Sequence, residues 1–266
     1  MQDKKSVEVC FSPKLFPDIV TTGDFTVVLV DILRATTTIC TAVGNGAEAI
    51  IPVETLDEAR QLKGEGFLVA SEKDGAQLDF ADFGNSAFSF TREAIAGKTL
   101  VYCTTNGTKA LHIAANAGNV NGGGTSGGSA SSDPAAHDGA ARVVVIGAFI
   151  NISALTEWLA CRRQNVVILC SGWKRKFCLE DTLFAGALTE RLLATGLFRT
   201  GCDSAHASLD LWSLARGDVL GYMEKAAHRH RLRKLGLDDV IPYSFSFDEV
   251  SVVPVFDGET IRDTAH

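Results

Sequence analysis

The chain has 266 residues, of which 46% are hydrophobic and 21% are charged, a balance typical of a folded globular protein. Its net charge of -7 argues against a nucleic-acid-binding surface, and no apolar run approaches the roughly 20 residues that cross a bilayer. The seven cysteines include no Cys-x-x-Cys pair, which predicts reduced thiols rather than a disulfide framework or a zinc site. Because the N-terminus shows no apolar signal-peptide core, we expect a cytoplasmic protein. From the charge and the short apolar runs, we expect neither a membrane nor a nucleic-acid partner.

In chain order, the first part of the sequence alternates strand and helix patterns. An apolar run at 25–32 predicts a buried strand, and a helix pattern follows that ends near Gly44 or Gly46. The other elements predicted in this part are strands at 48–53, 67–71 and 98–103, a capped helix at 55–66, a short helix or turn at 88–97, and a helix at 107–118. Strands followed by helices of crossover length indicate parallel strand pairing.

A segment of small and polar residues separates this part from the next. Residues 118–140 offer no side chain suited to anchor a core and therefore predict a flexible surface insertion. The elements predicted after the insertion are strands at 142–149, 165–172 and 250–256 and helices at 151–164 and 179–196. The run HRHRLRKLG at 228–236 predicts a solvated basic helix face, with a nucleic-acid patch as the less favoured interpretation.

These elements predict one α/β unit over residues 1–266, a three-layer α/β/α fold with a mixed, largely parallel sheet. Two halves, 1–117 and 141–266, contain similar strand, polar turn, helix and strand runs and would be joined by the insertion. Because βαβ units resemble one another anyway, an internal duplication stays an open alternative. A homodimer would be unsurprising for an α/β enzyme.

The first polar turn follows the strand at 25–32, at the kind of position where open α/β sheets bind ligands. Asp31 ends an apolar run, and its carboxylate is costly to bury unless it is paired, hydrogen-bonded or metal-bound. One interpretation is a helix cap or a salt bridge with Arg34. The other is a magnesium ligand or nucleophile, with Arg34 as a clamp for an oxyanion. Thr36 and Thr37 add hydroxyl groups to this turn.

A second polar turn follows the strand at 98–103. It combines hydroxyl groups, an amide and a glycine at a predicted helix start, in Thr104, Thr105, Asn106, Gly107 and Thr108. Free backbone N–H groups at a helix start suit an oxyanion, and Lys109 could add a positive charge. A simple helix cap remains the alternative, although one threonine would suffice for it. Cys103 precedes the turn and is an alternative nucleophile, with a buried strand-end cysteine as the favoured interpretation.

A third turn follows the strand at 165–172 and contains a basic loop, 174–176. Glu180 and Asp181 then open a helix, where their carboxylates either favour the helix dipole or hold a magnesium ion, which uses few carboxylates. The loop after 67–71 contributes further oxygen donors, Glu72 and Asn85 among them. Each signal is weak alone, and together they describe oxygen ligands and anion-binding turns.

Several distinctive motifs occur in a fixed order along the chain. They are DILRATTT, GNGAEAIIPV, SEKDG followed by DFGNS, TTNGTKAL, FIN and LEDTLFAGAL. On these motifs the chain, from about Val27 to Phe256, resembles the 2-phosphosulfolactate phosphatases. The resemblance implies magnesium-dependent hydrolysis of 2-phospho-3-sulfolactate to 3-sulfolactate and phosphate, which in methanogens belongs to coenzyme M biosynthesis. Relatives in bacteria that need no coenzyme M leave the physiological substrate open.

The resemblance also implies a small anionic phosphate-ester substrate and a set of site residues. We expect Asp31, Arg34, Glu72 and Asn106 to be catalytic, with Asp31 or Glu72 as the general acid or base. The expected magnesium ligands are Asp31, Glu180 and Asp181. The expected substrate-binding residues are Arg34, Thr36, Thr37, Asn85, Thr104, Thr105, Asn106, Gly107, Thr108 and Lys109.

The chain departs from the family pattern in three places. It has Ser71-Glu72 where Gly-Glu is usual, FADFGNS where Gly-Phe-Asp-x-Gly-Asn-Ser is usual, and the insertion at 118–140. These departures put the identity of the substrate in doubt, and they do not put the fold in doubt. The alternatives are a phosphatase acting on another small phosphorylated hydroxy acid, or a non-catalytic anion-binding protein of the same fold.

Overall fold

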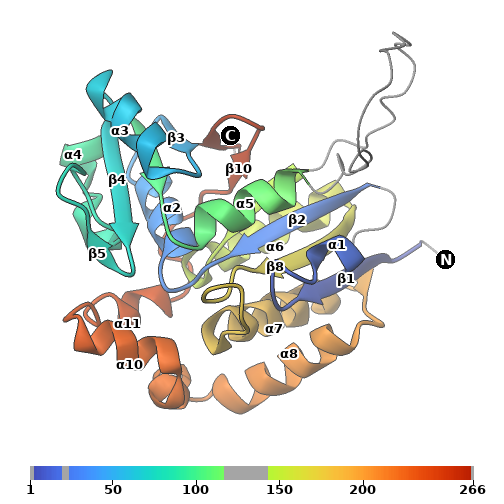
Figure 1. The fold of residues 1–266 in the computed structure, drawn as a ribbon. Helices are drawn as coiled ribbons and strands as arrows, with labels where there is room; N and C mark the ends of the chain where they lie inside the picture. The colour runs from blue at the N-terminus through green and yellow to red at the C-terminus, as the bar shows by residue number, and fades with distance from the viewer. Residues whose placement is uncertain (1–2, 20–23, 117–142, 265–266) are drawn as a thin grey trace, which may run out of the picture.

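The computed structural model describes residues 3–19, 24–116 and 143–264. Within these ranges the chain forms one eleven-stranded sheet with helices packed around it (Figure 1). The sheet is mixed and mostly parallel, so the predicted α/β fold class is confirmed. The predicted insertion at 118–140 lies outside the described residues.

The strands contribute to the sheet in an order that differs from their order in the chain. Across the sheet they run β5-β4-β6-β3-β11-β10-β7-β2-β8-β1-β9. Their bounds are β1 (Lys5–Cys10), β2 (Phe25–Val30), β3 (Ala49–Pro52), β4 (Leu68–Lys73), β5 (Ala76–Gln77), β6 (Thr99–Cys103), β7 (Val143–Gly147), β8 (Asn165–Cys170), β9 (Phe198–Arg199), β10 (Pro254–Phe256) and β11 (Ile261–Asp263).

Two parallel groups of strands are joined by a C-terminal hairpin. β7, β2, β8 and β1 are parallel, and so are β3, β6 and β4. The hairpin of β10 and β11 lies between the groups, with β10 antiparallel to β7 and β11 antiparallel to β3. β2 lies between β7 and β8, so the two predicted sequence halves contribute strands to the same sheet. The duplication itself stays a prediction.

β2 is the central strand of the larger group, and its sequence FTVVLV is buried throughout. Such a continuous apolar run is typical of a parallel strand covered on both faces. Val28 pairs with Val145 of β7 on one side and with Ile168 of β8 on the other. Because parallel strands end at the same edge, the turns after β2 and β8 meet there, which brings the first and third polar turns together.

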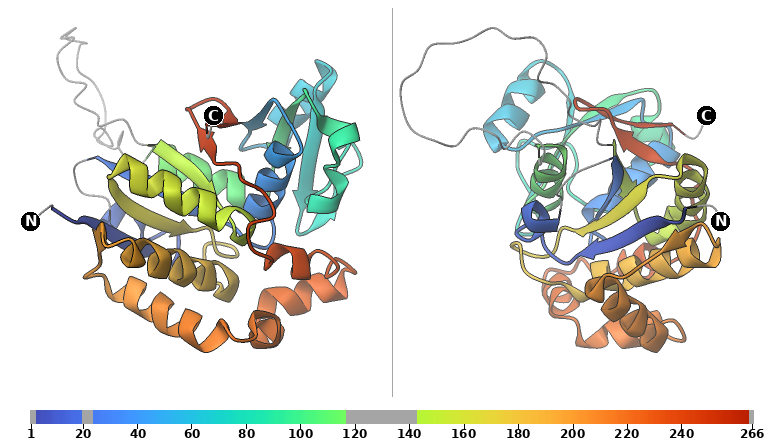
Figure 2. Two further views of the ribbon diagram at one scale, coloured as in Figure 1. Left: turned by 180° about the vertical axis from the view of Figure 1, so that it is seen from behind. Right: turned by 90° about the vertical axis from the view of Figure 1, so that its right-hand side faces the viewer.

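Helices cover both faces of this larger group of strands. Figure 2 shows α1 and α5 on one face and α6, α7 and α8 on the other. The helix bounds are α1 (Phe16–Ile19), α2 (Ala35–Gly44), α3 (Leu56–Gly64), α4 (Arg92–Ile95), α5 (Gly107–Asn116), α6 (Ile152–Arg162), α7 (Leu179–Ala194), α8 (Asp203–Ala215), α9 (Val219–Tyr222), α10 (Ala227–Lys234) and α11 (Ile241–Ser244). Among the helices described here, none is both long and apolar enough to span a bilayer.

Most predicted elements are present with small shifts at their ends. The helix predicted at 55–66 is α3, whose Thr55 and Glu58 form a capping box. The strand predicted at 250–256 is shorter than expected, since β10 begins only at Pro254. The sequence interpretation missed β1 and α8. β1 pairs with β8 at one side of the larger strand group, and α8 is one of the helices that cover this group.

Candidate active site

A small cavity of about 20 Å³, room for one water molecule, lies where the polar turns meet. Its wall includes residues from all three predicted turns and from α10. The lining residues that carry polar groups or charges are Asp31, Arg34, Glu72, Asn85, Thr105, Asn106, Trp173, His228 and Arg231. The structure therefore brings together the four predicted catalytic residues, Asp31, Arg34, Glu72 and Asn106, in one buried place.

The turn between β2 and α2 is built by its own threonines. Thr36 Oγ1 accepts from the Asp31 amide at 3.0 Å, and Thr37 Oγ1 donates to the Ile32 carbonyl at 3.0 Å. Both threonines are buried and use these hydroxyls on the backbone, so they position the turn instead of facing a ligand. Asp31 Oδ1 lies 3.4 Å from the Ala35 amide, a weak cap that leaves the carboxylate at the cavity.

Glu72 ties two loops together beneath the cavity. Its Oε1 accepts from the Thr105 amide at 2.7 Å and its Oε2 from the Gly75 amide at 2.6 Å. The Arg34 guanidinium is buried and donates to the Gly75 carbonyl at 2.9 Å. Because both Glu72 oxygens already accept backbone hydrogen bonds, Glu72 is placed to hold Arg34 and the second turn in position.

The first turn of α5 combines a helix cap with a close approach to Asp31. Thr104 Oγ1 accepts from the Thr108 amide at 3.3 Å, and Thr108 Oγ1 in turn donates to the Thr104 carbonyl at 3.1 Å. A Cβ on Gly107 would stand 2.6 Å from Ala35 Cβ and 3.2 Å from Asp31 Oδ2, so only glycine fits there. The Thr104 and Thr108 side chains thus cap the helix start, as the capping interpretation predicts, and the start of α5 lies against the Asp31 carboxylate.

The loop after β8 docks onto this helix start. The Lys174 amide donates to Asn106 Oδ1 at 3.1 Å, and Asp181 Oδ2 accepts from the Gly172 amide at 3.0 Å. Trp173 lines the cavity, with the Arg231 guanidinium carbon 4.8 Å from its ring centroid. Its indole Nε1 is a buried donor without a hydrogen-bond partner among the described residues. An unsatisfied donor at a cavity wall marks a place for an acceptor on a ligand.

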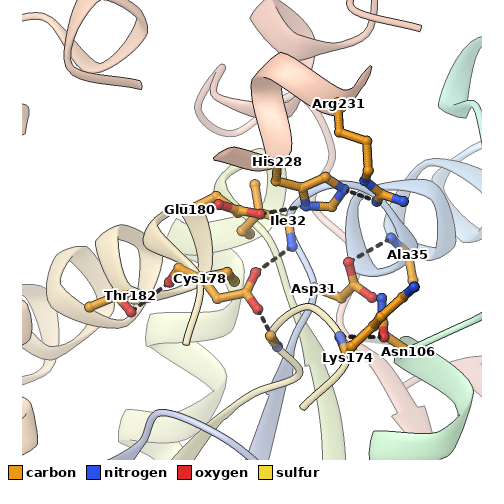
Figure 3. Close-up of polar contacts among 12 residues, drawn as sticks. Asp31, Ile32, Ala35, Asn106, Lys174, Cys178, Glu180, Thr182, His228 and Arg231 are labelled. Carbon is orange, nitrogen blue, oxygen red and sulfur yellow. Dashed lines mark hydrogen bonds and ion pairs between the residues drawn. The ribbon is translucent and has the colours of Figure 1, made fainter. Parts of the chain in front are cut away.

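Helix α10 closes the cavity with one face, which was not predicted, while His230, Arg233 and Lys234 form the predicted solvated face. His228 has 9% of its side chain exposed, and its Nδ1 lies 2.7 Å from Glu180 Oε1 (Figure 3). Its Nε2 lies 2.5 Å from Arg231 Nη2. A guanidinium can only donate, so in this arrangement Nε2 accepts from Arg231 and Nδ1 donates to Glu180. One sequence signal was available for this contact. His228 and Arg231 have i, i+3 spacing, which places them on one helix face, and the apolar Leu232, which is buried, lies next to them.

The buried carboxylates repel one another. Burial, together with the charge of Asp181, raises the pKa of Asp31 to about 7. Burial, together with the charge of Glu180, raises the pKa of Asp181 to about 7 as well. Burial raises the pKa of Cys103 to about 11, and that thiol packs in an apolar cluster with Val53 and Val69. A protonated thiol in such a place is a poor nucleophile, so the geometry disfavours the Cys103 alternative.

The three predicted magnesium ligands, Asp31, Glu180 and Asp181, differ in how their carboxylate oxygens are engaged. No three His, Cys, Asp or Glu side chains in the described ranges converge as a metal-binding group. Asp181 uses Oδ1 on the Ile32 amide and Oδ2 on the Gly172 amide, so its side chain positions those two turns. Glu180 Oε2, in contrast, is buried without a partner among the described residues. Asp31 and Glu180, both beside His228, are therefore the two candidate ligands (Figure 3).

The remaining predicted binding residues divide into two groups. Asn85 lines the cavity, and its Oδ1 accepts from the Tyr102 hydroxyl. Lys109 is exposed and lines a neighbouring groove together with Thr105 and Asn106, instead of the cavity itself. Asn151 of the FIN motif is fully buried and bonds only backbone groups, so that motif is structural. The sequence interpretation did not identify Trp173, His228 and Arg231 as site residues.

Fold and site together define an α/β protein with a small polar cavity at the carboxyl ends of parallel strands, the position typical of ligand sites in open α/β sheets. The model of the 2-phosphosulpholactate phosphatase family matches residues 10–130 and 124–259. The chain belongs to this family.

Similar proteins support this assignment over nearly the whole chain. A probable 2-phosphosulfolactate phosphatase of Gloeobacter violaceus is 35% identical over 253 residues, 93% of this chain and 94% of that protein. Proteins of the same description from Thermotoga maritima and Caldanaerobacter subterraneus subsp. tengcongensis are 31% and 30% identical, each over at least 86% of both chains. The predicted family is therefore confirmed.

Proposed function

We propose that the protein hydrolyses the phosphate ester of 2-phospho-3-sulfolactate with water, giving 3-sulfolactate and inorganic phosphate, in a magnesium-dependent reaction. The observation that carries this proposal is the cavity in which the buried Asp31 carboxylate shares a wall with the Arg34 and Arg231 guanidinium groups. Such a site pairs oxyanion donors with a carboxylate that can exchange a proton. Membership of the phosphatase family supplies the substrate class.

The protein side chains would bind and orient the phosphoryl group. Arg34 and Arg231 offer fork-shaped donors that match phosphoryl oxygens, and Trp173 Nε1 and the first amides of α5 add further donors. Asp31 is the group placed to take or deliver a proton, or to attack phosphorus, because its carboxylate lies against this helix start. Magnesium held by Asp31 and Glu180 would neutralise charge on the phosphoryl oxygens.

Substrate binding requires α10 to move away from the cavity. A volume of about 20 Å³ admits a water molecule, whereas ligand pockets span roughly 300–1,000 Å³. Opening would break the bond between His228 and Glu180 and the 3.4 Å contact of Arg231 Nη1 with the Asp74 carbonyl. When α10 closes again, it returns Arg231 to the phosphoryl group and excludes water other than the attacking molecule.

The test is phosphate release from 2-phospho-3-sulfolactate, 2-phospholactate and p-nitrophenyl phosphate, each with magnesium and with EDTA. We expect magnesium-dependent release with the highest kcat/KM on 2-phospho-3-sulfolactate. Release confined to another ester would retain the phosphatase activity and discard this substrate. No release from any ester by folded, magnesium-loaded protein would favour a non-catalytic anion-binding protein.

A further inference from the structure

A second hollow, a groove of about 560 Å³, lies beside the catalytic cavity. The two share Thr105 and Asn106, so this dipeptide at the start of α5 forms a common wall. On the groove side the lining includes three cations, Lys109 from α5 and Lys174 and Arg175 from the loop after β8. The groove is thus a larger space that borders the cavity.

The groove contains a buried donor that no protein group satisfies. Ser171 is 1% exposed, lines the groove, and its Oγ has no hydrogen-bond partner among the described residues. His112 Nε2 lines the same groove and is likewise buried without a partner in the described ranges. Buried polar atoms are nearly always paired in native proteins, and each exception calls for a ligand or water. These two residues therefore make the groove a suitable place for a polar ligand.

The backbone of the loop after β8 fixes the two residues that bring its cations to the groove lining. Lys174 and Arg175 both have positive φ, 51° and 59°, between the mutual backbone bonds of Trp173 and Lys176. Such a turn usually has Asn-Gly at these positions, because side chains disfavour this conformation. The Lys174 amide is fixed on Asn106 Oδ1, which ties the turn to the wall shared with the catalytic cavity.

The charges of the groove favour an anion. Lys174 lies 3.5 Å from Asp74, whereas Lys109 and Arg175 have no ion-pair partner in the part of the chain that the structure describes. The carboxylate of Glu54, which also lines the groove, lies 3.5 Å from His112. With Lys174 paired to Asp74, Lys109 and Arg175 face the single carboxylate of Glu54, which leaves an excess of positive charge in a groove that is also lined by two residues with unsatisfied polar atoms. A compact group with several anionic oxygens, a sulfonate or a carboxylate, matches this lining.

We propose that this groove binds the non-phosphoryl acidic group of the substrate, its sulfonate or its carboxylate, while the phosphoryl group occupies the adjoining cavity at Thr105 and Asn106, the two residues that line both spaces. This inference rests on the proposed function for the identity of the ester. The groove thereby sets the specificity of the enzyme for phosphate esters that bear a second strong acid.

The test is calorimetric titration of wild-type protein and variants with 3-sulfolactate and with lactate, which needs no turnover. Lys109→Gln is expected to raise the Kd for 3-sulfolactate about tenfold and Ser171→Ala about threefold, through loss of a charged and a neutral hydrogen bond. Lys176→Gln is the matched control, because it removes the same charge from a lysine of the neighbouring loop after β8 that does not line the groove. It should leave both Kd values unchanged.

The ligand pair identifies the acid group that occupies the groove. An effect of Lys109→Gln on 3-sulfolactate alone assigns the sulfonate to the groove, and an equal effect on lactate assigns the carboxylate. The inference is overturned if wild-type protein binds neither acid, or if Lys109→Gln and Lys176→Gln have the same effect. Loss of 3-sulfolactate binding in Lys109→Gln, in a protein that releases no phosphate from any ester, would uphold the groove and reject the proposed function.

Discussion

At the residue scale, the site depends on donors and carboxylates that have been removed from water. Trp173 shows this most simply, since its ring contacts Arg231 and Lys174 while its buried Nε1 has no partner within the described ranges. The ring fixes the position of two cations, and the N–H remains available to an oxygen of the substrate. These two contributions can be separated by substitution.

Trp173→Phe keeps an aromatic ring and removes the indole N–H. We expect kcat/KM to fall about tenfold, the effect of one hydrogen bond to a charged group, with little change in thermal stability. Steady-state kinetics and a melting curve would measure both quantities. Trp158→Phe is the matched control, because Trp158 packs on α6 against Arg162, away from the cavity, and should leave kcat/KM unchanged. Unaltered kinetics in Trp173→Phe would mean that the indole N–H does not contact the substrate.

The sequence revealed some of these residues because their types are costly to bury. Asp31, Arg34 and Glu72 stand out in or next to apolar strands, and the structure gathers all three at the cavity. Thr36 and Thr37 have equally suggestive types, yet their hydroxyls are used by the backbone. Which way a hydroxyl points depends on local backbone geometry, and a residue type alone does not encode it.

At the element scale, the start of α5 is fixed by the helix that it contacts. The space beside Gly107 is occupied by Ala35 Cβ, 2.6 Å from an added Cβ, so α5 and α2 approach one another closely beside Asp31. The glycine is needed for this contact and not for an unusual φ. The two helix starts therefore hold the Asp31 carboxylate between them.

Gly107→Ala forces these two helices apart. We expect the free energy of unfolding to fall by about 1–3 kcal/mol, the usual cost of overpacking, and kcat to fall because Asp31 moves relative to α5. Chemical denaturation and phosphate release would measure the two effects. Gly64→Ala, at the end of α3 with no atom near the added Cβ, is the control and should be neutral or slightly stabilising. Equal behaviour of the two variants would contradict the close-contact argument.

The sequence pattern predicts most of the helices and strands, but it did not predict that one face of α10 lines the cavity. Periodicity and turn residues identify strands such as β2 and helices such as α7 from local pattern alone. The run 228–236 has so many basic residues that a solvated helix is the natural expectation, and His230, Arg233 and Lys234 are indeed exposed. Only tertiary contact with α7 turns His228 inward, and a local pattern contains no information about that contact.

At the scale of the whole molecule, the long-range topology was the least predictable part. A C-terminal hairpin inserts between two parallel strand groups, and β2 lies between strands that follow it by more than 110 residues. Pairings of such separation leave no local sequence signal. Their consequence is a site whose charges come from distant parts of the chain and whose protonation is linked to folding.

The stability of the metal-free protein should depend on pH through Asp31 and Asp181. Their folded pKa of about 7 exceeds the ordinary value of 3.8, so the folded state binds more protons between these values. This contribution is fully present below about pH 3.8 and is lost as the pH rises through 7. We therefore expect the Tm in EDTA to be higher at pH 5.5 than at pH 8, by roughly 2 °C or more.

Magnesium and the Asp181→Asn substitution distinguish the pH dependence of Tm caused by Asp31 and Asp181 from the pH dependence caused by other groups. Magnesium should raise the Tm more at pH 8 than at pH 5.5, because a cation offsets the repulsion between deprotonated carboxylates. Asp181→Asn should flatten the pH dependence, and Asp79→Asn, at an exposed position, should not. A Tm in EDTA that rises from pH 5.5 to pH 8 would contradict the assignment of the raised pKa values.

The most direct test of the central claim is magnesium-dependent phosphate release from 2-phospho-3-sulfolactate by wild-type protein, Asp31→Asn and Asp79→Asn. The proposal predicts release by the wild type and by Asp79→Asn, and a fall in kcat of about 10³-fold in Asp31→Asn, the scale of a lost proton-transfer group. Release by folded Asp31→Asn at the wild-type rate would contradict it, because the reaction would then occur without the carboxylate around which the site is built.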